Sequence, residues 1–216
     1  MRPTDRLLGV LKAFVFALAL VPLAQLVAGA FWFPEWLGAN PAEFINRATG
    51  RWALRFLLIT LAVTPLRMLT GWNWLLRFRR MLGLFVFFYA VTHVTSYAGF
   101  DRVFQLEEIL KDIAKRPFIT VGFTALLLLI PLAATSTNAM VRRLGAKRWL
   151  ALHRLVYLIA PLGVLHFWWM VKRDLTQPAI YAAILAVLLG YRIVVRFRAA
   201  AGSRDAVRAA ERRQAA

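Results

Sequence analysis

Cysteine is absent from this sequence of 216 residues. Its absence excludes disulfide frameworks, cysteine-based zinc sites, iron–sulfur clusters and thiol chemistry. Acidic residues are also scarce, because ten Asp and Glu stand against 28 Lys and Arg, for a formal net charge of +18. In a soluble chain that charge would point to nucleic acid, but 61% of the residues here are hydrophobic. We therefore expect membrane lipid and no nucleic acid as partner, with basic residues flanking membrane spans.

Long apolar stretches dominate what is present. A bilayer core about 30 Å thick needs about 20 mostly apolar helical residues, and six stretches reach or approach that length. We expect spans at residues 7–30, 52–69, 82–100, 118–135, 149–171 and 179–195. The first could be a signal peptide, but it is longer than the apolar region of about 7–15 residues that such peptides carry. The predicted fold class is an all-α integral membrane protein with a bundle of six transmembrane helices, followed by a basic tail at 199–216.

The basic residues are unevenly shared between the two sides of this arrangement. With the N-terminus inside, eighteen of the 28 fall in inner segments and eight in outer connections. Cytoplasmic loops accumulate Lys and Arg. We therefore expect both termini in the cytoplasm, which agrees with an even number of spans.

The three histidines all fall inside predicted spans. His93 lies in the third span, whereas His153 and His166 lie in the fifth. At about 1.5 Å per residue, His93 and His166 come to matched depths in the outer half, and His153 lies about 20 Å below. On an ideal helix His153 and His166 point about 140° apart. An ionisable residue inside a span indicates function by default, and a neutral imidazole bonded to a neighbouring carbonyl is the alternative.

Two opposed imidazoles in an apolar bundle suit haem iron. Imidazole binds Zn, Cu, Fe and haem iron, but a structural zinc site uses four ligands and no Asp or Glu lies inside any predicted span. Porphyrin supplies the four ligands that the bundle lacks, and Gly83, Gly99 and Gly163 are candidates for close helix approach. The residues favour a haem electron-transfer protein. A small proton-coupled transporter or channel and a structural subunit without a cofactor are the alternatives.

Motifs along nearly the whole chain resemble those of the MsrQ family, also called YedZ, which belongs to the ferric-reductase-like transmembrane group. The motifs are Thr49-Gly50-Arg51-Trp52, Thr64-Pro65-Leu66-Arg67, Arg79-Arg80-Met81-Leu82-Gly83-Leu84, Tyr89-Ala90-Val91-Thr92-His93, Lys115-Arg116-Pro117-Phe118-Ile119-Thr120-Val121-Gly122, Pro131-Leu132-Ala133-Ala134-Thr135-Ser136, Arg143-Leu144-Gly145, Leu152-His153-Arg154-Leu155-Val156-Tyr157 and His166-Phe167-Trp168-Trp169.

The resemblance implies a bacterial inner-membrane b-type cytochrome with haem b and FMN as cofactors, in which residues 1–198 form the haem domain. It implies that electrons pass from the quinone pool or a cytosolic flavin reductase to a periplasmic molybdopterin enzyme, MsrP, which reduces methionine sulfoxide in oxidised proteins. His93, His153 and His166 match the family's haem-ligand histidines. A stand-alone transmembrane metal or quinol reductase is the alternative within this class.

The number of haems stays open. The wider group usually carries two histidines on each of two helices, whereas the inner position of the third span here lies near Arg79 or Arg80. We expect His93 and His166 to form the outer pair. His153 either serves an inner haem with an unconventional partner or belongs to a flavin or quinone site, so that one or two haems are expected.

Basic residues at the inner rim are candidates for a flavin or haem-propionate contact. Arg77, Arg79 and Arg80 would suit a phosphate or carboxylate, as would the segment 142–148, although positive-inside topology explains the same charges. The chain has neither a G-x-G-x-x-G motif nor a P-loop. We therefore expect an electron-transfer subunit with no catalytic residue of its own, whose primary electron donor is another protein or a quinone.

The outer connection at 101–116 is a candidate docking loop for a periplasmic partner. It holds Glu107, Glu108 and Asp112 among four basic residues. An ordinary solvated loop is the alternative.

Overall fold

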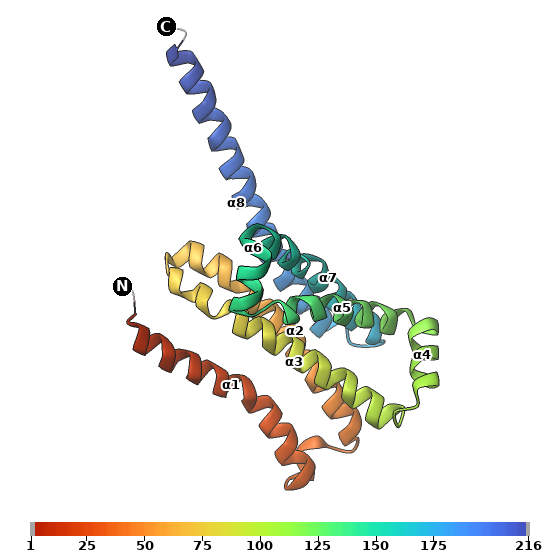
Figure 1. Cartoon of the computed structure of the whole chain (residues 1–216). Coiled ribbons are helices and arrows are strands. Elements are labelled where there is room, and N and C mark those ends of the chain that lie inside the picture. The colour runs from red at the N-terminus through yellow and green to blue at the C-terminus, as the bar shows by residue number, and fades with distance from the viewer. Residues whose placement is uncertain (1–2, 215–216) are drawn as a thin grey trace.

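A computed structural model describes the backbone of residues 3–214 and the side chains of residues 3–198 and 201 (Figure 1). The described backbone contains no strand. Its α-helices are α1 (Asp5–Phe31), α2 (Pro41–Thr70), α3 (Arg79–Ser96), α4 (Leu106–Lys115), α5 (Pro117–Ala134), α6 (Asn138–His153), α7 (Val156–Met170) and α8 (Thr176–Gln214). Two 3-10 helices, η1 (Pro34–Leu37) and η2 (Asn73–Arg77), lie in the first two connections, and a π-helical turn, η3 (Tyr97–Asp101), extends α3.

Six helical segments are long and apolar enough to cross a membrane, which confirms the predicted all-α fold with six spans. They are Asp5–Phe31, Pro41–Thr70, Arg79–Asp101, Pro117–Ala134, Asn138–Met170 and Thr176–Arg198. The second begins well before the predicted residue 52, because Asn40 caps the helix by accepting the backbone N–H of Glu43 and Pro41 occupies the first turn. The basic tail predicted at 199–216 continues α8 as far as Gln214, and residues 215–216 lie outside the described residues.

The fifth span is not one uniform α-helix. Between α6 and α7, Leu155 N–H donates to the carbonyl of Leu152, and Tyr157 N–H donates to that of Arg154. These i→i+3 bonds wind the chain more tightly than an α-helix, so the helical phase changes between His153 and His166. The ideal-helix angle of about 140° between the two side chains is therefore wrong.

A second deviation lies inside α6, at Gly145. This residue has a φ of 74° and a ψ of 152°, a backbone conformation that glycine adopts without steric cost. The residues before it form a separate helical segment, so the helix that carries His153 begins after Gly145. The fifth helical segment as a whole begins at Asn138, before the predicted start at residue 149.

The core of the bundle lies between α2, α3, α5, α7 and α8. α2 packs along α3, α5 packs along α7, and α3 also contacts α5. The rings of Phe85 and Tyr89 from α3 stack on Phe56 from α2, with centroids 5.5 and 5.4 Å away. Tyr89 is fully buried, and its hydroxyl donates to the carbonyl of Ala19 at 2.7 Å, which fastens α1 to α3. The two helices that carry His93 and His166 are thus held in one packed unit.

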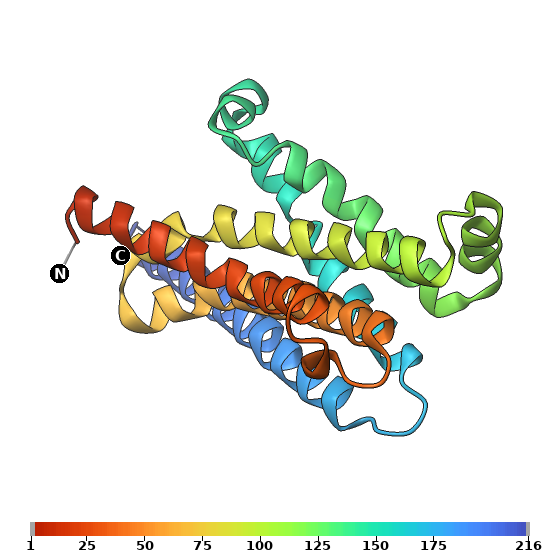
Figure 2. The same cartoon turned by 90° about the horizontal axis from the view of Figure 1, so that it is seen from below.

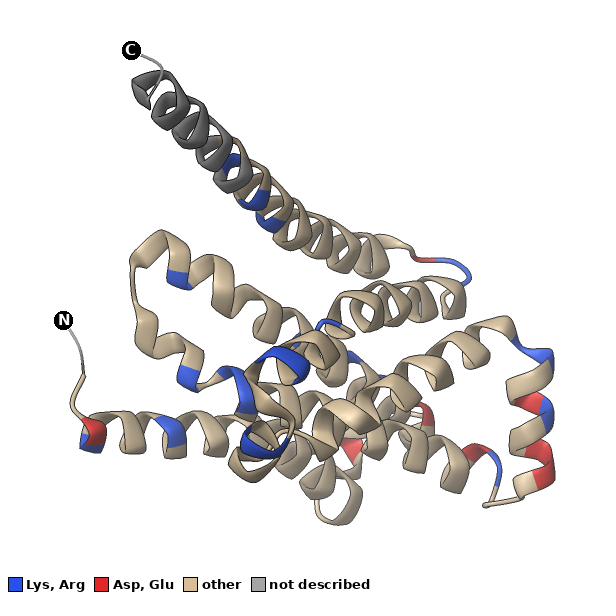
Figure 3. Ribbon diagram, turned by 45° about the horizontal axis from the view of Figure 1, so that its top comes forward, with Lys and Arg blue, Asp and Glu red and all other residues tan. Residues whose placement is uncertain are grey.

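The connections fall at two ends of the bundle (Figures 1 and 2). The start of α1, η2 and α6 lie toward one end, and η1, α4 and the α7–α8 connection lie toward the other. Asp and Glu gather mainly at the end that carries α4, whereas Lys and Arg follow η2 and α6 at the opposite end (Figure 3). The charge separation behind the predicted orientation is therefore present in three dimensions. The side of the membrane on which each end lies stays a prediction.

Candidate functional site

His93 of α3 and His166 of α7 lie next to each other. The centroids of their imidazole rings are 6.1 Å apart, and the ring planes make an angle of 69°. Both side chains are half-buried. The structure therefore brings together the two histidines that were expected to form a pair.

Each of these imidazoles is held through Nδ1 by a backbone carbonyl of a neighbouring helix. Nδ1 of His93 lies 2.9 Å from the carbonyl oxygen of Asn46 in α2, and Nδ1 of His166 lies 2.6 Å from that of Phe118 in α5. A carbonyl oxygen can only accept, so Nδ1 donates its proton in both rings. The neutral ring then carries its lone pair on Nε2, with the ring orientation fixed, as in histidines that bind a metal ion.

Two glycines make these hydrogen bonds sterically feasible. A Cβ placed on Gly50 would lie 3.1 Å from Nδ1 of His93, and a Cβ on Gly122 would lie 2.6 Å from Nδ1 of His166. Each glycine follows the accepting carbonyl by four residues, at 46 and 50 in α2 and at 118 and 122 in α5. Residues four apart lie one above the other on the same helix face. Because glycine has no side chain, the imidazole of another helix can approach the carbonyl that lies one turn earlier.

The spacing of the two rings fits an ion held between them. Metal–imidazole bonds are about 2 Å long and a ring centroid lies about 1 Å behind the bonded nitrogen, so two rings that bind one ion from opposite sides have centroids about 6 Å apart. The observed separation of 6.1 Å matches this distance. Among the residues whose side chains the structure describes, no three His, Cys, Asp or Glu are grouped to hold a metal ion. The pair therefore suits an ion whose other ligands belong to a bound group, as in haem.

His153 has different surroundings. Its Nε2 lies 3.1 Å from Oγ1 of Thr135, and this hydroxyl donates to the carbonyl of Pro131 at 2.6 Å. This hydroxyl can donate or accept, so it holds Nε2 of His153 without leaving that nitrogen free for another partner. The ring also stacks on Trp149, with centroids 3.9 Å apart. His153 thus differs from His93 and His166, whose hydrogen bonds engage Nδ1.

The chain is similar to known proteins along most of its length. Residues 49–164 match the family model described as ferric reductase like transmembrane component. Similar proteins include the "Protein-methionine-sulfoxide reductase heme-binding subunit MsrQ" of Herminiimonas arsenicoxydans, 58% identical over 193 residues that make up 88% of each chain. The protein of the same name from Ralstonia nicotianae is 57% identical over 86% of each chain, and that from Azospira oryzae is 52% identical over 91% of this chain and 84% of its own.

The chain belongs to the MsrQ family. Membership confirms the resemblance that the motifs indicated, and together with the six apolar helices it makes this MsrQ-family chain a multi-pass membrane protein. The region matched by the family model includes His93 and His153 and ends two residues before His166.

The arginines expected at the inner rim of this MsrQ-family chain have separate neighbours. Arg77 forms an ion pair with Asp5, with Nη1 and Oδ1 2.8 Å apart, and so joins η2 to the start of α1. Arg79 lies close to Tyr157 of α7 and Arg192 of α8. Arg79 and Arg80 both lie near His153, whereas Arg77 is engaged with Asp5.

Arg80 lies on a cleft between α3 and α6. The cleft has a volume of about 370 Å³, and Asn138, Arg142, Trp149 and Val141 line it with Arg80. Trp149 is also the residue on which His153 stacks. Two of the basic residues named from the sequence, Arg80 and Arg142, therefore share one cleft beside His153.

Sequence reasoning missed the groups that hold the imidazoles. Gly50 and Gly122 were present in the quoted motifs, but Gly83, Gly99 and Gly163 were named for close approach, and none of these three touches a histidine. On both helices a glycine follows the accepting carbonyl by one helical turn. Because every helix carbonyl is a potential acceptor, this pattern identifies the contact only once the position of the histidine is known.

The docking role predicted for the connection at 101–116 stays a prediction, but Asp112 does not lie at its surface. Its side chain is buried, and its carboxylate accepts from Tyr97, Arg102 and Arg116 within the chain. The other two acidic residues named there, Glu107 and Glu108, form ion pairs with Lys111.

Proposed function

We propose that this chain is a b-type cytochrome of the bacterial inner membrane, in which His93 and His166 bind the iron of one haem b through Nε2. The observation that carries the proposal is the pair of neighbouring imidazoles, with centroids 6.1 Å apart, each with Nδ1 donating to a carbonyl. Haem, when bound, supplies one-electron redox chemistry. Neighbouring rings and two matched hydrogen bonds are not needed by histidines that only fill a packed core.

The residues around the pair prepare the ligands. The carbonyls of Asn46 and Phe118 fix the tautomer and the orientation of each ring, and acceptance from Nδ1 makes Nε2 a stronger donor to a metal. Thr49 is fully buried and also donates to the carbonyl of Asn46, at 2.8 Å, which restrains that acceptor. The protein thus contributes ligand basicity and ring geometry before any cofactor enters.

We propose an electron-transfer role within a methionine sulfoxide reductase system. Relatives that share over half of their residues with this chain are named as heme-binding subunits of protein-methionine-sulfoxide reductase. The positive-inside rule supports both termini in the cytoplasm, which puts the His93–His166 pair toward the periplasm. Electrons then leave from this pair to an MsrP-like periplasmic molybdopterin reductase. The quinone pool or a cytosolic flavin reductase supplies them, because the sequence has no nucleotide-binding motif.

Absorbance and haem stoichiometry test the cofactor. The protein is purified in detergent, and reduced-minus-oxidised spectra and pyridine-haem content are measured for the wild type and for His93→Ala, His166→Ala and His153→Ala. We expect the first two variants to lose the haem and His153→Ala to retain it. Absence of haem from the wild type after haem-replete expression would contradict the proposal and favour the transporter alternative, and retention of haem in His93→Ala would contradict the assigned ligands.

Reoxidation of the reduced protein tests the partner. The reduced cytochrome is mixed with an MsrP-like reductase and a methionine sulfoxide substrate, and the haem band is followed in time. Reoxidation that requires both additions supports the proposed role. Equally fast reoxidation by a ferric chelate without the reductase, with no response to the reductase, would favour a stand-alone metal reductase.

We propose that FMN binds in the cleft formed by Arg80, Arg142 and Trp149. The two guanidinium groups suit a phosphate, and the indole offers a flat aromatic face to a ring system. Both features line the cleft of about 370 Å³. Flavin per protein in the double variant Arg80→Gln with Arg142→Gln, compared with Arg77→Gln, is the test. We expect the double variant to lose most of its flavin and the control to retain it, and equal retention would remove this assignment.

A further inference from the structure

α4 crosses the end of the bundle instead of running along it. It connects η3, at the end of the α3 span, to the start of α5, and it runs across the end of these helices (Figures 1 and 2). A helix in this position lies parallel to the membrane surface, at the level where two spans leave the bilayer.

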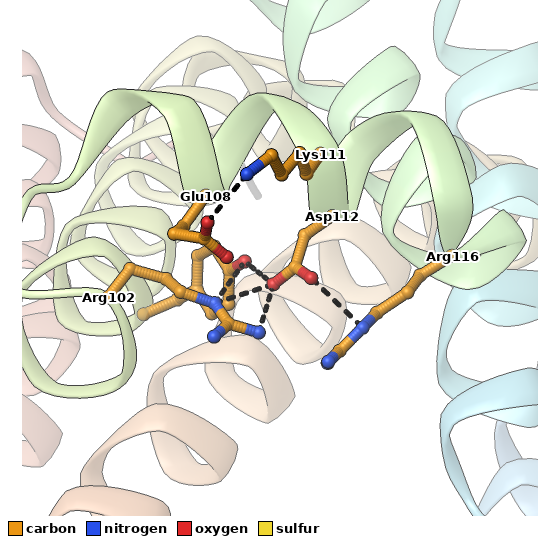
Figure 4. Close-up of polar contacts among 6 residues, drawn as sticks. Arg102, Glu108, Lys111, Asp112 and Arg116 are labelled. Carbon is orange, nitrogen blue, oxygen red and sulfur yellow. Dashed lines mark hydrogen bonds and ion pairs between the residues drawn. The ribbon is translucent and has the colours of Figure 1, made fainter.

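One side of α4 is fastened to the protein by Asp112. Its carboxylate accepts from Arg102 Nε at 2.6 Å, from the hydroxyl of Tyr97 and from Arg116 Nε at 3.0 Å (Figure 4). Tyr97 belongs to η3, and Arg102 lies in the loop before α4. Arg116 is the residue immediately before α5. Asp112 is only 7% exposed. These bonds connect α4 to both flanking spans and set its rotation about its own axis.

With that rotation set, a second side of α4 carries large apolar side chains that the protein does not cover. Leu106 is 66% exposed and Leu110 is 56% exposed. Four residues apart, they share one helix face, which at about 100° per residue lies well away from that of Asp112. A third side is charged, because Lys111 Nζ lies 2.9 Å from a carboxylate oxygen of Glu107. The helix thus has separate protein-facing, apolar and charged sides.

The loop before α4 adds to the apolar side. Val103 and Phe104 are 72% and 67% exposed, and both have positive φ, 48° and 56°. This backbone region is unfavourable for residues other than glycine, and most of all for β-branched valine. In water the chain would both strain its backbone and expose two apolar side chains, whereas an apolar environment removes the second cost.

We propose that α4, with Val103 and Phe104, is an interfacial helix whose apolar side rests in the lipid of the bilayer surface. Lipid is the occupant because the apolar side adjoins the end of the α3 span: the ring of Phe104 lies against Gly99 of η3, where a Cβ would be 3.3 Å away, and the neighbouring Phe100 is exposed. Amphipathic helices lie in the interface with the apolar side buried and the charged side in water. Asp112 then acts as the anchor that keeps Leu106 and Leu110 turned to the lipid.

Site-directed spin labelling tests this proposal, because the chain contains no cysteine to remove. Leu110→Cys and the matched control Glu107→Cys are each labelled with a nitroxide in lipid nanodiscs without any partner protein. The accessibility of each label to oxygen, which concentrates in lipid, is compared with its accessibility to a water-soluble nickel chelate. We expect the ratio of oxygen to nickel accessibility to be several-fold higher at residue 110 than at residue 107.

Two outcomes would overturn the proposal. Equal ratios at 107 and 110 would mean that the apolar side faces water, and a label at 110 that neither reagent reaches would mean that protein covers it. Leu106→Cys repeats the measurement one turn earlier and guards against a local effect of the label. The proposal does not rest on the haem, so haem content, measured in the same samples, reports folding independently.

Discussion

The two histidine levels of this molecule differ in the group that meets the imidazole. At His93 and His166 a backbone carbonyl takes the proton of Nδ1, whereas at His153 the hydroxyl of Thr135 engages Nε2. Nε2 therefore carries a free lone pair in the pair, but in the single ring the same nitrogen is already engaged by the hydroxyl. Location in a span is common to all three, so the hydrogen-bond partner decides which histidines are prepared to bind a metal.

The same contrast extends to the helix behind each ring. Gly50 and Gly122 leave space against which the rings of His93 and His166 lie, one turn after the accepting carbonyl. His153 instead lies against the side chains of Thr135 and Trp149. A carbonyl in a helix is already bonded to the N–H four residues later, so it reaches a second donor only where that later residue has no side chain in the way.

The largest expected effect that would break this contrast comes from Gly122→Ala. Its Cβ would lie 2.6 Å from Nδ1 of His166, a distance that real Cβ atoms do not adopt, so the ring must leave the carbonyl of Phe118. We expect loss of most of the bound haem and of the absorbance of a six-coordinate iron with two imidazole ligands, measured by pyridine-haem content and visible spectra.

Gly163→Ala is the matched control for this variant. Gly163 lies in α7, the helix that carries His166, whereas Gly122 lies in α5; a Cβ on Gly163 would meet only Leu54 and Leu57, at 3.5 and 3.8 Å, which are ordinary contacts. We expect nearly full haem content there. Full haem with an unchanged spectrum in Gly122→Ala would show that the glycine is not required by the ring.

A smaller effect of the same kind is expected from Gly50→Ala. The contact with His93 would be 3.1 Å, so a shift of a few tenths of an ångström relieves it. We expect the haem to be retained in part, with a changed midpoint potential because the hydrogen bond from Nδ1 to Asn46 lengthens and the ligand becomes less basic. Potentiometric titration measures the change, and a loss of haem greater than in Gly122→Ala would contradict the order of the two effects.

The sequence was sufficient for the parts of the molecule that depend on length and composition. Six apolar stretches predicted six spans, and counting residues from the span ends placed His93 and His166 at one depth. These features follow from bilayer thickness and helix rise alone. The role of the pair as haem ligands stays a prediction until the cofactor is measured.

What could not be predicted depends on contacts between helices. The carbonyl of Phe118 reaches His166 only because α5 packs on α7, and Thr135 reaches His153 only because the chain turns at Gly145. The change of helical phase after His153 comes from i→i+3 bonds, which no apolar periodicity reports. Spacing along one helix therefore gave the depth of each ring but not its partner.

Thr135→Val would sharpen the contrast from the side of His153. Valine keeps the shape of threonine but removes the hydroxyl that is hydrogen-bonded to Nε2 of His153, at 3.1 Å. We expect a loss of about 1 kcal/mol in the free energy of unfolding, and no loss of the haem proposed at His93 and His166. Thermal unfolding in detergent and haem content measure the two effects.

Thr124→Val is the control for that substitution. The hydroxyl of Thr124 is exposed and donates only to the carbonyl of Thr120 in its own helix, at 2.8 Å. We expect a smaller change in stability. Loss of the paired haem in Thr135→Val, but not in Thr124→Val, would mean that the two histidine levels are coupled and that the contrast is incomplete.

The smallest expected effect is the pH dependence of the α4 anchor at Asp112. Hydrogen-bond donors surround this carboxylate, whereas acceptors meet His93 and His166. Burial alone would raise the pKa of this carboxyl, but hydrogen bonds from Tyr97 and Arg102 and the charges of Arg116 and Arg102 outweigh it and hold the pKa below the usual value. The stabilisation is therefore complete above the ordinary carboxyl pKa of about 3.9 and is lost as the pH falls through the lower folded-state pKa.

We expect a spin label at residue 110 to stay immobile at neutral pH and to gain mobility only below about pH 4. In Asp112→Asn we expect mobility at every pH, because the neutral amide cannot replace the carboxylate between two arginines. A label whose mobility follows pH equally in both proteins would show that another group, and not Asp112, fastens α4.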